Sequence, residues 1–568
     1  MRSSDSVARL PRRRNRLEWF SACGIIILEA LAEPGGSAPE LWGEIGAAIW
    51  RHLLLILDMT VAAIFSWRFV ESLRDGSDTS SVIRTLTLLV GLLAGFWSTR
   101  VMAAIFLVHD GIGALRAAML EGLSPILSRR LRQSPALMLA LSFILMIACG
   151  AILLMFPGAS TGPRVNVTDA WFTAVSASCV TGLITLDTAK VWSPFGLFVI
   201  TFLIQIGGLG VMVFGAAAAS WAGVRLSSSG EELARNVFET DDTRELRWIL
   251  RTVILGTFLI ELIGAIALYP TFSESLGHTL PAVGYAFFHS ISAFCNAGFA
   301  LYSSSLIHFQ ADLWFNSVLV ILVTLGGLGF GVVVGLLRFC LRRHRFLSLH
   351  ARVVLGMSFT LTLGGGLMFF LFEFDGILRG VGLADSLLIS FFQSATTRTA
   401  GFNTVPIDEL SRTTLMWMMV WMAIGASPGS TGGGVKTTTV FVLLAAMFTY
   451  SKQDESIIVS GRTLPTKVVF RALAVLGGAT VIWLIGMLLI IGFEPDKDFL
   501  ALAFEVTSAL GTAGLSLGIT SELSISGKWL VSALMFLGRI GPLTLAVATF
   551  GTRQSRHVKY PRGRILIG

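Results

Sequence analysis

Four short glycine loops recur along the chain, and each is followed by a long apolar segment. The copies lie 116, 103 and 113 positions apart, counted between Gly182, Gly298, Gly401 and Gly514. Glycine tolerates backbone angles that turn successive carbonyl oxygens toward one axis, and rings of such carbonyls can replace the water around a dehydrated cation. The repetition therefore predicts four matching units around one ion pore.

The composition indicates a membrane protein with many spanning segments. Of the 568 residues, 54% are hydrophobic and 14% are charged, and the mean hydropathy is +0.75. A membrane-spanning helix needs about 20 mostly apolar residues. Ten stretches meet this need, near residues 49–71, 83–108, 136–157, 194–222, 249–270, 313–338, 352–373, 413–449, 468–493 and 528–550.

The basic residues predict the orientation of these spans. A net charge of +8 would suggest nucleic acid as a partner in a soluble protein, but here the basic clusters lie between apolar spans. With ten spans, every cluster falls on the side of the N-terminus: residues 12–16, 129–132, 338–352, 452–467 and 553–564. We therefore expect the lipid bilayer as partner and no nucleic acid, with both termini cytoplasmic and all four glycine loops outside.

Each unit is predicted to contain a spanning helix, a shorter half-helix, the glycine loop and a second spanning helix. The half-helices cover residues 170–178, 282–294, 385–396 and 499–509, and all are too short to cross a membrane. They should be re-entrant, with loops that line a cavity and C-terminal ends whose partial negative charge favours a cation. The predicted fold class is an all-α polytopic membrane protein with four pseudo-repeated helix–pore-helix–filter-loop–helix units around one central pore.

The units set the expected domain boundaries. Pore repeats 1 to 4 should occupy residues 136–222, 249–338, 352–449 and 468–550. Residues 1–135 precede the first repeat, contain two of the ten spans and read as an accessory region, while 551–568 form a basic cytoplasmic tail. Residues 18–33 fit an interfacial helix, a spanning helix or a signal segment, and the sequence leaves all three open.

The four loops carry a family resemblance. They read Ser-Cys-Val-Thr-Gly-Leu ending at Leu183, Phe-Cys-Asn-Ala-Gly-Phe ending at Phe299, Thr-Arg-Thr-Ala-Gly-Phe ending at Phe402, and Leu-Gly-Thr-Ala-Gly-Leu ending at Leu515. Over about residues 136–550, the chain closely resembles the Trk/Ktr/HKT superfamily of potassium transporters, especially membrane subunits of the TrkH and KtrB type. Four loops in order, at similar spacing and with agreeing topology, make the resemblance specific.

The resemblance implies an ion-selective constriction made of the glycines and the residues before them. The implied potassium-binding residues are Val180, Thr181, Gly182, Asn296, Ala297, Gly298, Thr399, Ala400, Gly401, Thr512, Ala513 and Gly514. Family members with serine at the first glycine are associated with sodium, so four glycines favour potassium as the transported ion. No cofactor and no metal other than potassium at the filter is expected. A sodium-permeable or sodium-coupled transporter of the same fold is the alternative.

A second glycine-rich stretch, residues 425–434, reads Gly-Ala-Ser-Pro-Gly-Ser-Thr-Gly-Gly-Gly inside an otherwise apolar span. Its glycines and proline should interrupt the helix, and the resemblance implies an intramembrane gating loop beneath the filter. Arg539 lies at the same predicted depth, where an ionisable side chain is costly unless it is paired or faces water. The implied gate residues are Gly425, Ser427, Pro428, Gly429, Gly432, Gly433, Gly434 and Arg539.

Other charges lie near the predicted filter. Arg398 precedes Gly401 by three residues and must be held away from the ion or neutralised, for which Glu505 is the expected partner. Three acidic residues follow their filters on the predicted outer face, where they either raise the local cation concentration or form a solvated rim: Asp187, Asp408 and Glu522.

An enzyme is the remote alternative, because Gly425 to Gly429 formally match the G-x-S-x-G nucleophile elbow with Ser427 as nucleophile. No strand is predicted before Ser427, so we do not expect catalysis. The resemblance further implies a homodimer in the inner (cell) membrane, with a complete pore in each protomer. It also implies a cytosolic ring of nucleotide-binding regulatory subunits of the TrkA/KtrA type.

Overall fold

The computed structural model of the chain describes residues 135–210, 243–341, 346–452 and 456–541. The two spans predicted within residues 1–135, the question of residues 18–33 and the tail at 551–568 lie outside the described residues. Among the described residues the regular elements are helices, with one short antiparallel hairpin in which β1 (Ile458–Val459) pairs with β2 (Arg462–Thr463). The all-α class predicted from the sequence is confirmed.

Three main helices recur in the same order in each repeat. Repeat 1 contains α6 (Pro135–Leu154), α7 (Val167–Cys179) and α9 (Pro194–Leu209), and repeat 2 contains α12 (Thr243–Leu276), α13 (Leu280–Phe294) and α14 (Leu313–Leu328). Repeat 3 contains α16 (Leu349–Glu373), α17 (Leu383–Thr397) and α18 (Arg412–Ala423), and repeat 4 contains α20 (Thr466–Phe493), α21 (Phe499–Gly511) and α22 (Ile525–Ile540). Shorter or additional elements are η2 (Pro157–Ala159), α8 (Thr188–Val191), η3 (Ile307–Phe309), α15 (Phe330–Cys340), α19 (Thr437–Ser451) and η4 (Ile519–Glu522).

The middle helix of each repeat is the predicted half-helix, and we call α7, α13, α17 and α21 the pore helices. Their observed bounds differ from the predicted ones by only a few residues. Each is followed by its glycine loop and then by α9, α14, α18 or α22, which we call the inner helices. Every inner helix starts at a side-chain cap, because an oxygen of the capping residue accepts a hydrogen bond from a backbone N–H three positions on. The caps are Ser193, Asp312, Ser411 and Ser524.

Glycines end three of the inner helices, and this corrects one predicted span. The stretch 313–338 is not one continuous helix, since α14 and α15 meet at Gly329 with a bend of 107°. Gly329 has φ of +91°, and Gly210 and Gly541 end α9 and α22 with φ of +77° and +85°. Such angles do not continue a right-handed helix and strain any residue with a Cβ.

Among the described helices, three are long and apolar enough to cross a membrane unaided, and the bent pair α14–α15 would make a fourth. The three are Thr252–Leu276 within α12, and the whole of α16 and α20. Shorter apolar helices overlap three of the other predicted spans, at Ala140–Leu154, Pro194–Leu209 and Thr437–Ser451, and the ends of 194–222 and 528–550 lie outside the described residues.

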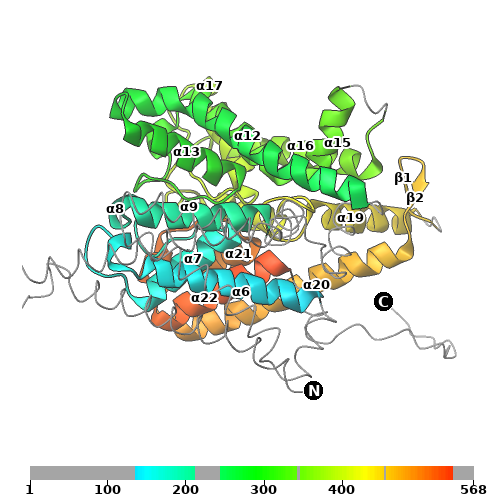
Figure 1. The fold of residues 1–568 in the computed structure, drawn as a ribbon. Coiled ribbons are helices and arrows are strands. Elements are labelled where there is room, and N and C mark those ends of the chain that lie inside the picture. Colours follow the sequence, from blue (N-terminus) through cyan, green and yellow to red (C-terminus); the bar gives the residue numbers. More distant parts are fainter. Residues whose placement is uncertain (1–134, 211–242, 342–345, 453–455, 542–568) are drawn as a thin grey trace, which may run out of the picture.

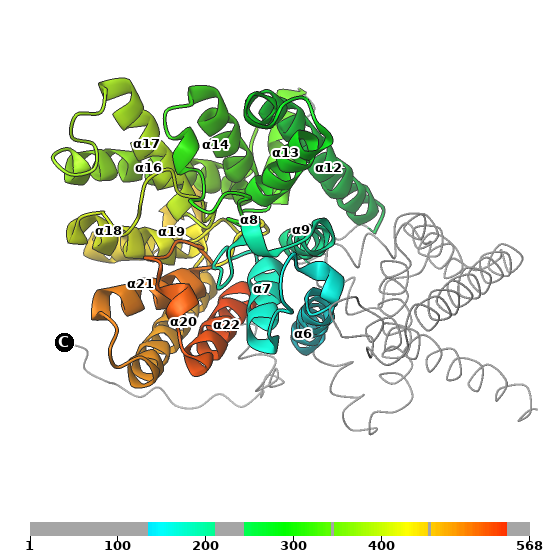
Figure 2. The same ribbon diagram turned by 90° about the vertical axis from the view of Figure 1, so that its left-hand side faces the viewer.

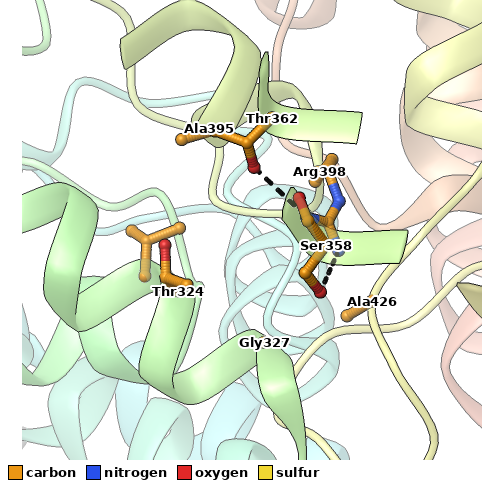
Figure 3. Close-up of a pocket in the computed structure, with 8 residues that line it drawn as sticks. Thr324, Gly327, Ser358, Thr362, Ala395, Arg398 and Ala426 are labelled. Atoms are coloured by element: carbon orange, nitrogen blue, oxygen red, sulfur yellow. Dashed lines mark hydrogen bonds between the residues drawn. The ribbon is translucent and has the colours of Figure 1, made fainter. Parts of the chain in front are cut away.

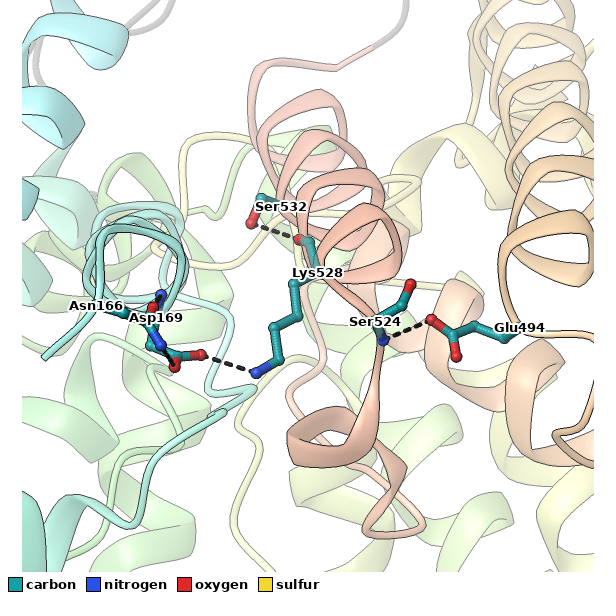
Figure 4. A network of polar contacts seen from close by, with 6 residues as sticks. All are labelled: Asn166, Asp169, Glu494, Ser524, Lys528 and Ser532. Atoms are coloured by element: carbon teal, nitrogen blue, oxygen red, sulfur yellow. Dashed lines mark hydrogen bonds and ion pairs between the residues drawn. The ribbon is translucent and has the colours of Figure 1, made fainter.

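The four repeats surround a common centre, as seen with the chain turned end-on (Figure 2); the same helices lie in stacked layers in the side view (Figure 1). The last repeat contacts the first through α22 and α7, where Lys528 Nζ lies 2.9 Å from the Asp169 carboxylate (Figure 4). Both side chains are largely buried, at 15% and 7% exposed. Nearby, the Ser524 N–H donates to the carboxylate of Glu494, the residue that follows α20, at 2.7 Å and so fixes the start of α22. The circle of repeats is therefore closed by the Lys528–Asp169 ion pair.

Candidate functional site

The four repeated glycines form a closed ring. A Cβ added to Gly182 would lie 2.7 Å from the Ala297 carbonyl oxygen, and one at Gly298 would lie 2.9 Å from that of Ala400. A Cβ at Gly401 would lie 3.0 Å from the Ala513 oxygen, and one at Gly514 would collide with the Thr181 oxygen. Each glycine thus touches the backbone of the next repeat, and the fourth touches the first. Loops separated by more than a hundred residues meet at one constriction.

Along each ring loop the backbone conformation alternates between left-handed and ordinary φ values, which can direct successive carbonyl groups to one side. The ring glycines have φ between +70° and +99°. The residue two positions earlier also has positive φ in every repeat, at Val180, Asn296, Thr399 and Thr512. The intervening residue does not, so left-handed and ordinary conformations alternate and successive carbonyls can point to one side. We call the residues at these three positions of the four loops the filter residues, after the role that the family resemblance implies for them.

The filter residues turn their N–H groups back toward the pore helices. Thr181 N donates to the Ser176 oxygen at 2.9 Å, and Ala297 N donates to the Ser292 oxygen at 2.7 Å. Ala513 N does the same toward Ser508 at 2.8 Å. In contrast, no hydrogen bond within the described part of the chain ends on the carbonyl oxygen of a filter residue. Because buried carbonyls rarely lack a partner, these oxygens are suited to replace a cation's hydration shell.

Hydroxyl side chains on the pore helices hold the loops in this shape. The Ser176 hydroxyl accepts from Gly182 N at 3.1 Å, the Ser292 hydroxyl donates to the Phe299 carbonyl at 2.8 Å, and Thr396 donates to the Phe402 carbonyl at 2.6 Å. The sequence reasoning missed these supports. A serine or threonine five or six positions before each ring glycine, at Ser176, Ser292, Thr396 and Ser508, was the available signal, although the Ser508 hydroxyl itself has no hydrogen-bond partner among the described residues.

The inner helices pack directly under the ring through small residues. A Cβ at Gly207, Gly326 or Gly538 would collide with a carbonyl oxygen at the C-terminal end of the pore helix in the same repeat. The oxygens belong to Ser178, Phe294 and Leu510, each four positions before its ring glycine. Glycine at these inner-helix positions therefore allows the backbone of the inner helix to support the filter at the same depth in three repeats.

In repeat 3 the inner helix is interrupted by residues 424–436, between α18 and α19, as the glycine-rich stretch predicted. We call this segment the crossing loop. It folds back on itself, since Gly425 N donates to the Val435 oxygen at 2.9 Å and Ala426 N to the Gly433 oxygen at 3.3 Å. Gly429 and Gly434 both have φ of +69°, which the sharp reversal requires.

The crossing loop is bonded to its neighbours on both sides. Toward repeat 4, Gly433 N donates to the hydroxyl of the filter residue Thr512 at 3.0 Å. Toward repeat 2, Ser427 N donates to the Gly327 oxygen at 3.1 Å, and the Thr431 hydroxyl donates to the Phe294 oxygen at 3.3 Å. A Cβ at Gly432 would also collide with the side chain of the filter residue Thr399. The crossing loop therefore lies directly against the second, third and fourth repeats, and it contacts the filter residues Thr399 and Thr512.

Two basic side chains are bonded to backbone oxygens at this depth. Arg539 of α22 donates to the Thr431 oxygen in the crossing loop and to the Gly207 oxygen of α9. Lys436 Nζ donates to the Gly432 oxygen at 2.7 Å. Arg539 thus connects repeat 4, the crossing loop and repeat 1.

The expected ion pair between Arg398 and Glu505 is wrong. Glu505 accepts hydrogen bonds from Ser516, at 2.9 Å, and from Thr520, both of which follow the fourth filter loop. Arg398 turns away from the ring toward α16, where it contacts Ser358 and Thr362 (Figure 3). Repeats 3 and 4 are neighbours, but the two charges do not meet. The Arg398 side chain extends to Ser358 on α16, whereas the Glu505 carboxylate accepts from the hydroxyls of Ser516 and Thr520.

Two of the three outer acidic residues are already paired. Asp187 lies 3.4 Å from Lys190. Glu522 is bonded to Lys497, and the hydrogen bond from that lysine holds the pKa of Glu522 below its usual value. These pairs make a solvated rim the better interpretation for both carboxylates.

Ser427 lacks the surroundings of a nucleophile. Its hydroxyl forms a hydrogen bond with Thr437 at 3.1 Å, and no strand precedes it in the crossing loop. Within the described ranges, no group of three or more His, Cys, Asp or Glu residues is placed to hold a metal ion. The local chemistry is that of backbone oxygens and hydroxyls.

Comparisons of this chain with known proteins all lead to the same family. The family model TrkH, described as a cation transport protein, matches residues 133–558. The Ktr system potassium uptake protein B of Bacillus subtilis is 35% identical over 443 residues, which are 77% of this chain and 97% of that protein. The potassium/sodium uptake protein NtpJ of Enterococcus hirae is 33% identical over 452 residues, 78% of this chain and 100% of that protein. The crystal structure of the potassium transporter TrkH from Vibrio parahaemolyticus matches in fold, with a TM-score of 0.63, 19% identity and coverage of 86% and 97%.

Proposed function

The chain belongs to the TrkH family of cation transport proteins, and we propose that it takes up potassium across the cell membrane through the ring of four glycine loops. As a member of a transporter family it is not an enzyme. The observation that carries the proposal is the closed ring, in which buried carbonyl oxygens from four repeats converge without hydrogen-bond donors. Such oxygens bind a dehydrated monovalent cation.

The filter residues are proposed as the potassium site, and the crossing loop with Arg539 as the gate. Support for the gate comes from the contacts of the loop with Thr399 and Thr512, directly behind two of the filter loops. The loop must move before an ion can pass, since Arg539 and Lys436 add positive charge where it lies. The membrane potential supplies about 2.3 kcal/mol per charge per 100 mV, which suffices to drive uptake without a coupling ion.

The assembly around the pore is also proposed. We place both termini in the cytoplasm on the strength of the basic clusters between the predicted spans. A homodimer and a cytosolic nucleotide-binding subunit of the TrkA/KtrA type complete the proposed complex. Such a subunit, docked on the cytoplasmic side, would control the crossing loop.

Uptake of radioactive rubidium into liposomes that contain the purified protein tests this function. Rubidium should enter, potassium should compete for it, and sodium should compete only at concentrations about tenfold higher or more, which corresponds to a difference of about 1.4 kcal/mol in binding. Liposomes without protein give the background. Equal competition by sodium would favour the sodium-permeable alternative. The similarity to the potassium/sodium uptake protein NtpJ is the reason to test that alternative.

A further inference from the structure

A buried positive charge lies directly behind the third filter loop. Arg398 is only 9% exposed, and it precedes the ring residue Gly401 by three positions. Arginine remains charged in proteins, and a buried charge is costly unless it is paired and well hydrogen-bonded. None of the ion pairs among the described residues includes Arg398. Its charge is therefore not neutralised by a carboxylate in the part of the chain that the structure describes.

The hydrogen bonds of Arg398 are long for a charged donor. Nη1 lies 3.3 Å from the Ser358 carbonyl oxygen and 3.5 Å from the Thr362 hydroxyl, and Nη2 lies 3.3 Å from the Ser358 hydroxyl. Charge-assisted N–H···O bonds are usually about 2.7–2.9 Å. The Nε–H group is buried and has no acceptor. The guanidinium thus keeps donor capacity that its protein neighbours do not use.

Arg398 also lines a small cavity between repeats 2 and 3. The cavity has a volume of about 20 Å³, which is room for one small ion or water. Its lining carries the hydroxyl groups of Thr324, Ser358 and Thr362, and Figure 3 shows Thr324 on α14 across the cavity from Ser358 and Arg398. No carboxylate lines the cavity. A buried guanidinium with hydroxyl donors and no competing acid is the chemistry of an anion site.

We propose that this cavity binds a small monovalent anion of the size of chloride, which neutralises Arg398 behind the third filter loop. A water molecule would offer an acceptor but would leave the charge uncompensated, whereas polyatomic anions exceed the space. One consequence of this site rests on the proposed function. The bound anion lowers the repulsion between Arg398 and the transported cation, so the affinity for potassium depends on the halide.

Anomalous diffraction from crystals of the protein grown in bromide locates the anion without any transport. We expect an anomalous peak in the cavity within hydrogen-bonding distance of the Arg398 guanidinium. Thr324→Val keeps the side-chain volume and should reduce the peak occupancy several-fold, while Arg398→Gln should remove it. Thr480→Val, on the exposed face of α20, is the matched control and should leave the peak unchanged. Ordered water in place of bromide in the unsubstituted protein would overturn the proposal.

The effect on the transported ion is measured separately, as the half-saturating rubidium concentration in chloride and in gluconate, which is too large for the cavity. We expect a value about tenfold higher in gluconate, with the difference abolished by Arg398→Gln. Equal values in both anions would overturn the consequence for potassium while a bromide peak still supported the site. Conversely, a bromide peak supports the anion site even in a protein whose crossing loop keeps the rubidium path closed, because the diffraction experiment needs no transport.

Discussion

Replacing Gly182 with serine should lower the selectivity for potassium over sodium about tenfold or more, because a side chain at this position disturbs the whole ring. The added Cβ would lie 2.7 Å from the Ala297 oxygen and 3.1 Å from Gly298 Cα, so the second filter loop must shift. The φ of +99° adds backbone strain, on the order of 1–3 kcal/mol for a residue other than glycine. Either effect displaces carbonyl oxygens that the ion needs, and a tenfold change requires only about 1.4 kcal/mol.

The measurement is rubidium flux into liposomes with sodium competition, for the wild type and the variant. Gly518→Ser is the matched control, since Gly518 has a similar φ of +88° but nothing within 4 Å of an added Cβ. It reproduces the backbone strain outside the ring and should leave selectivity unchanged. Unaltered selectivity in Gly182→Ser, with normal thermal stability, would contradict the assignment of the ring as the filter.

Replacing Arg539 with alanine should raise the rate of rubidium flux about tenfold. Arg539 donates to the Thr431 oxygen in the crossing loop and to the Gly207 oxygen of α9, which ties the loop between repeats 4 and 1. Hydrogen bonds from charged groups contribute about 1.5–3 kcal/mol each, so their loss shifts the loop toward positions that leave the path open. The substitution also removes a positive charge from beneath the filter.

Two further variants separate these effects in the same flux assay. Arg539→Lys retains the charge but not the two-armed guanidinium, so an intermediate increase would show that the hydrogen bonds themselves restrain the loop. Arg412→Ala removes an exposed arginine at the start of α18 and should not change the flux. Flux that stays unchanged or falls in Arg539→Ala, with intact ion selectivity, would show that Arg539 does not hold a gate closed.

Much of the architecture could be predicted because it depends on local sequence signals that recur. The short pore helices follow from apolar segments too brief to span a membrane, and each ends at a glycine loop whose residues repeat. The crossing loop followed from a proline and five glycines within ten residues of an apolar span. The break at Gly329 was missed, although Gly210 and Gly541 occupy the equivalent position and end their helices in the same way.

Side-chain partners could not be predicted in the same way. The pairing of Arg398 with Glu505 failed because the order of the repeats does not say toward which helix a long side chain turns. Arg398 contacts α16 of its own repeat, whereas Glu505 accepts a hydrogen bond from the hydroxyl of Ser516, which follows the fourth filter loop. Likewise, the pair Lys528–Asp169 joins residues from the two ends of the described chain, and only closure of the repeats brings them together.

The central claim is that the four glycine loops form one cation site. Anomalous diffraction at the rubidium edge, from crystals of the protein grown in rubidium, tests it most directly. The claim predicts a peak inside the ring of Gly182, Gly298, Gly401 and Gly514, within bonding distance of carbonyl oxygens from all four repeats. Replacing rubidium by sodium should empty the site. A ring without rubidium, or a peak bound by one repeat alone, would contradict the claim.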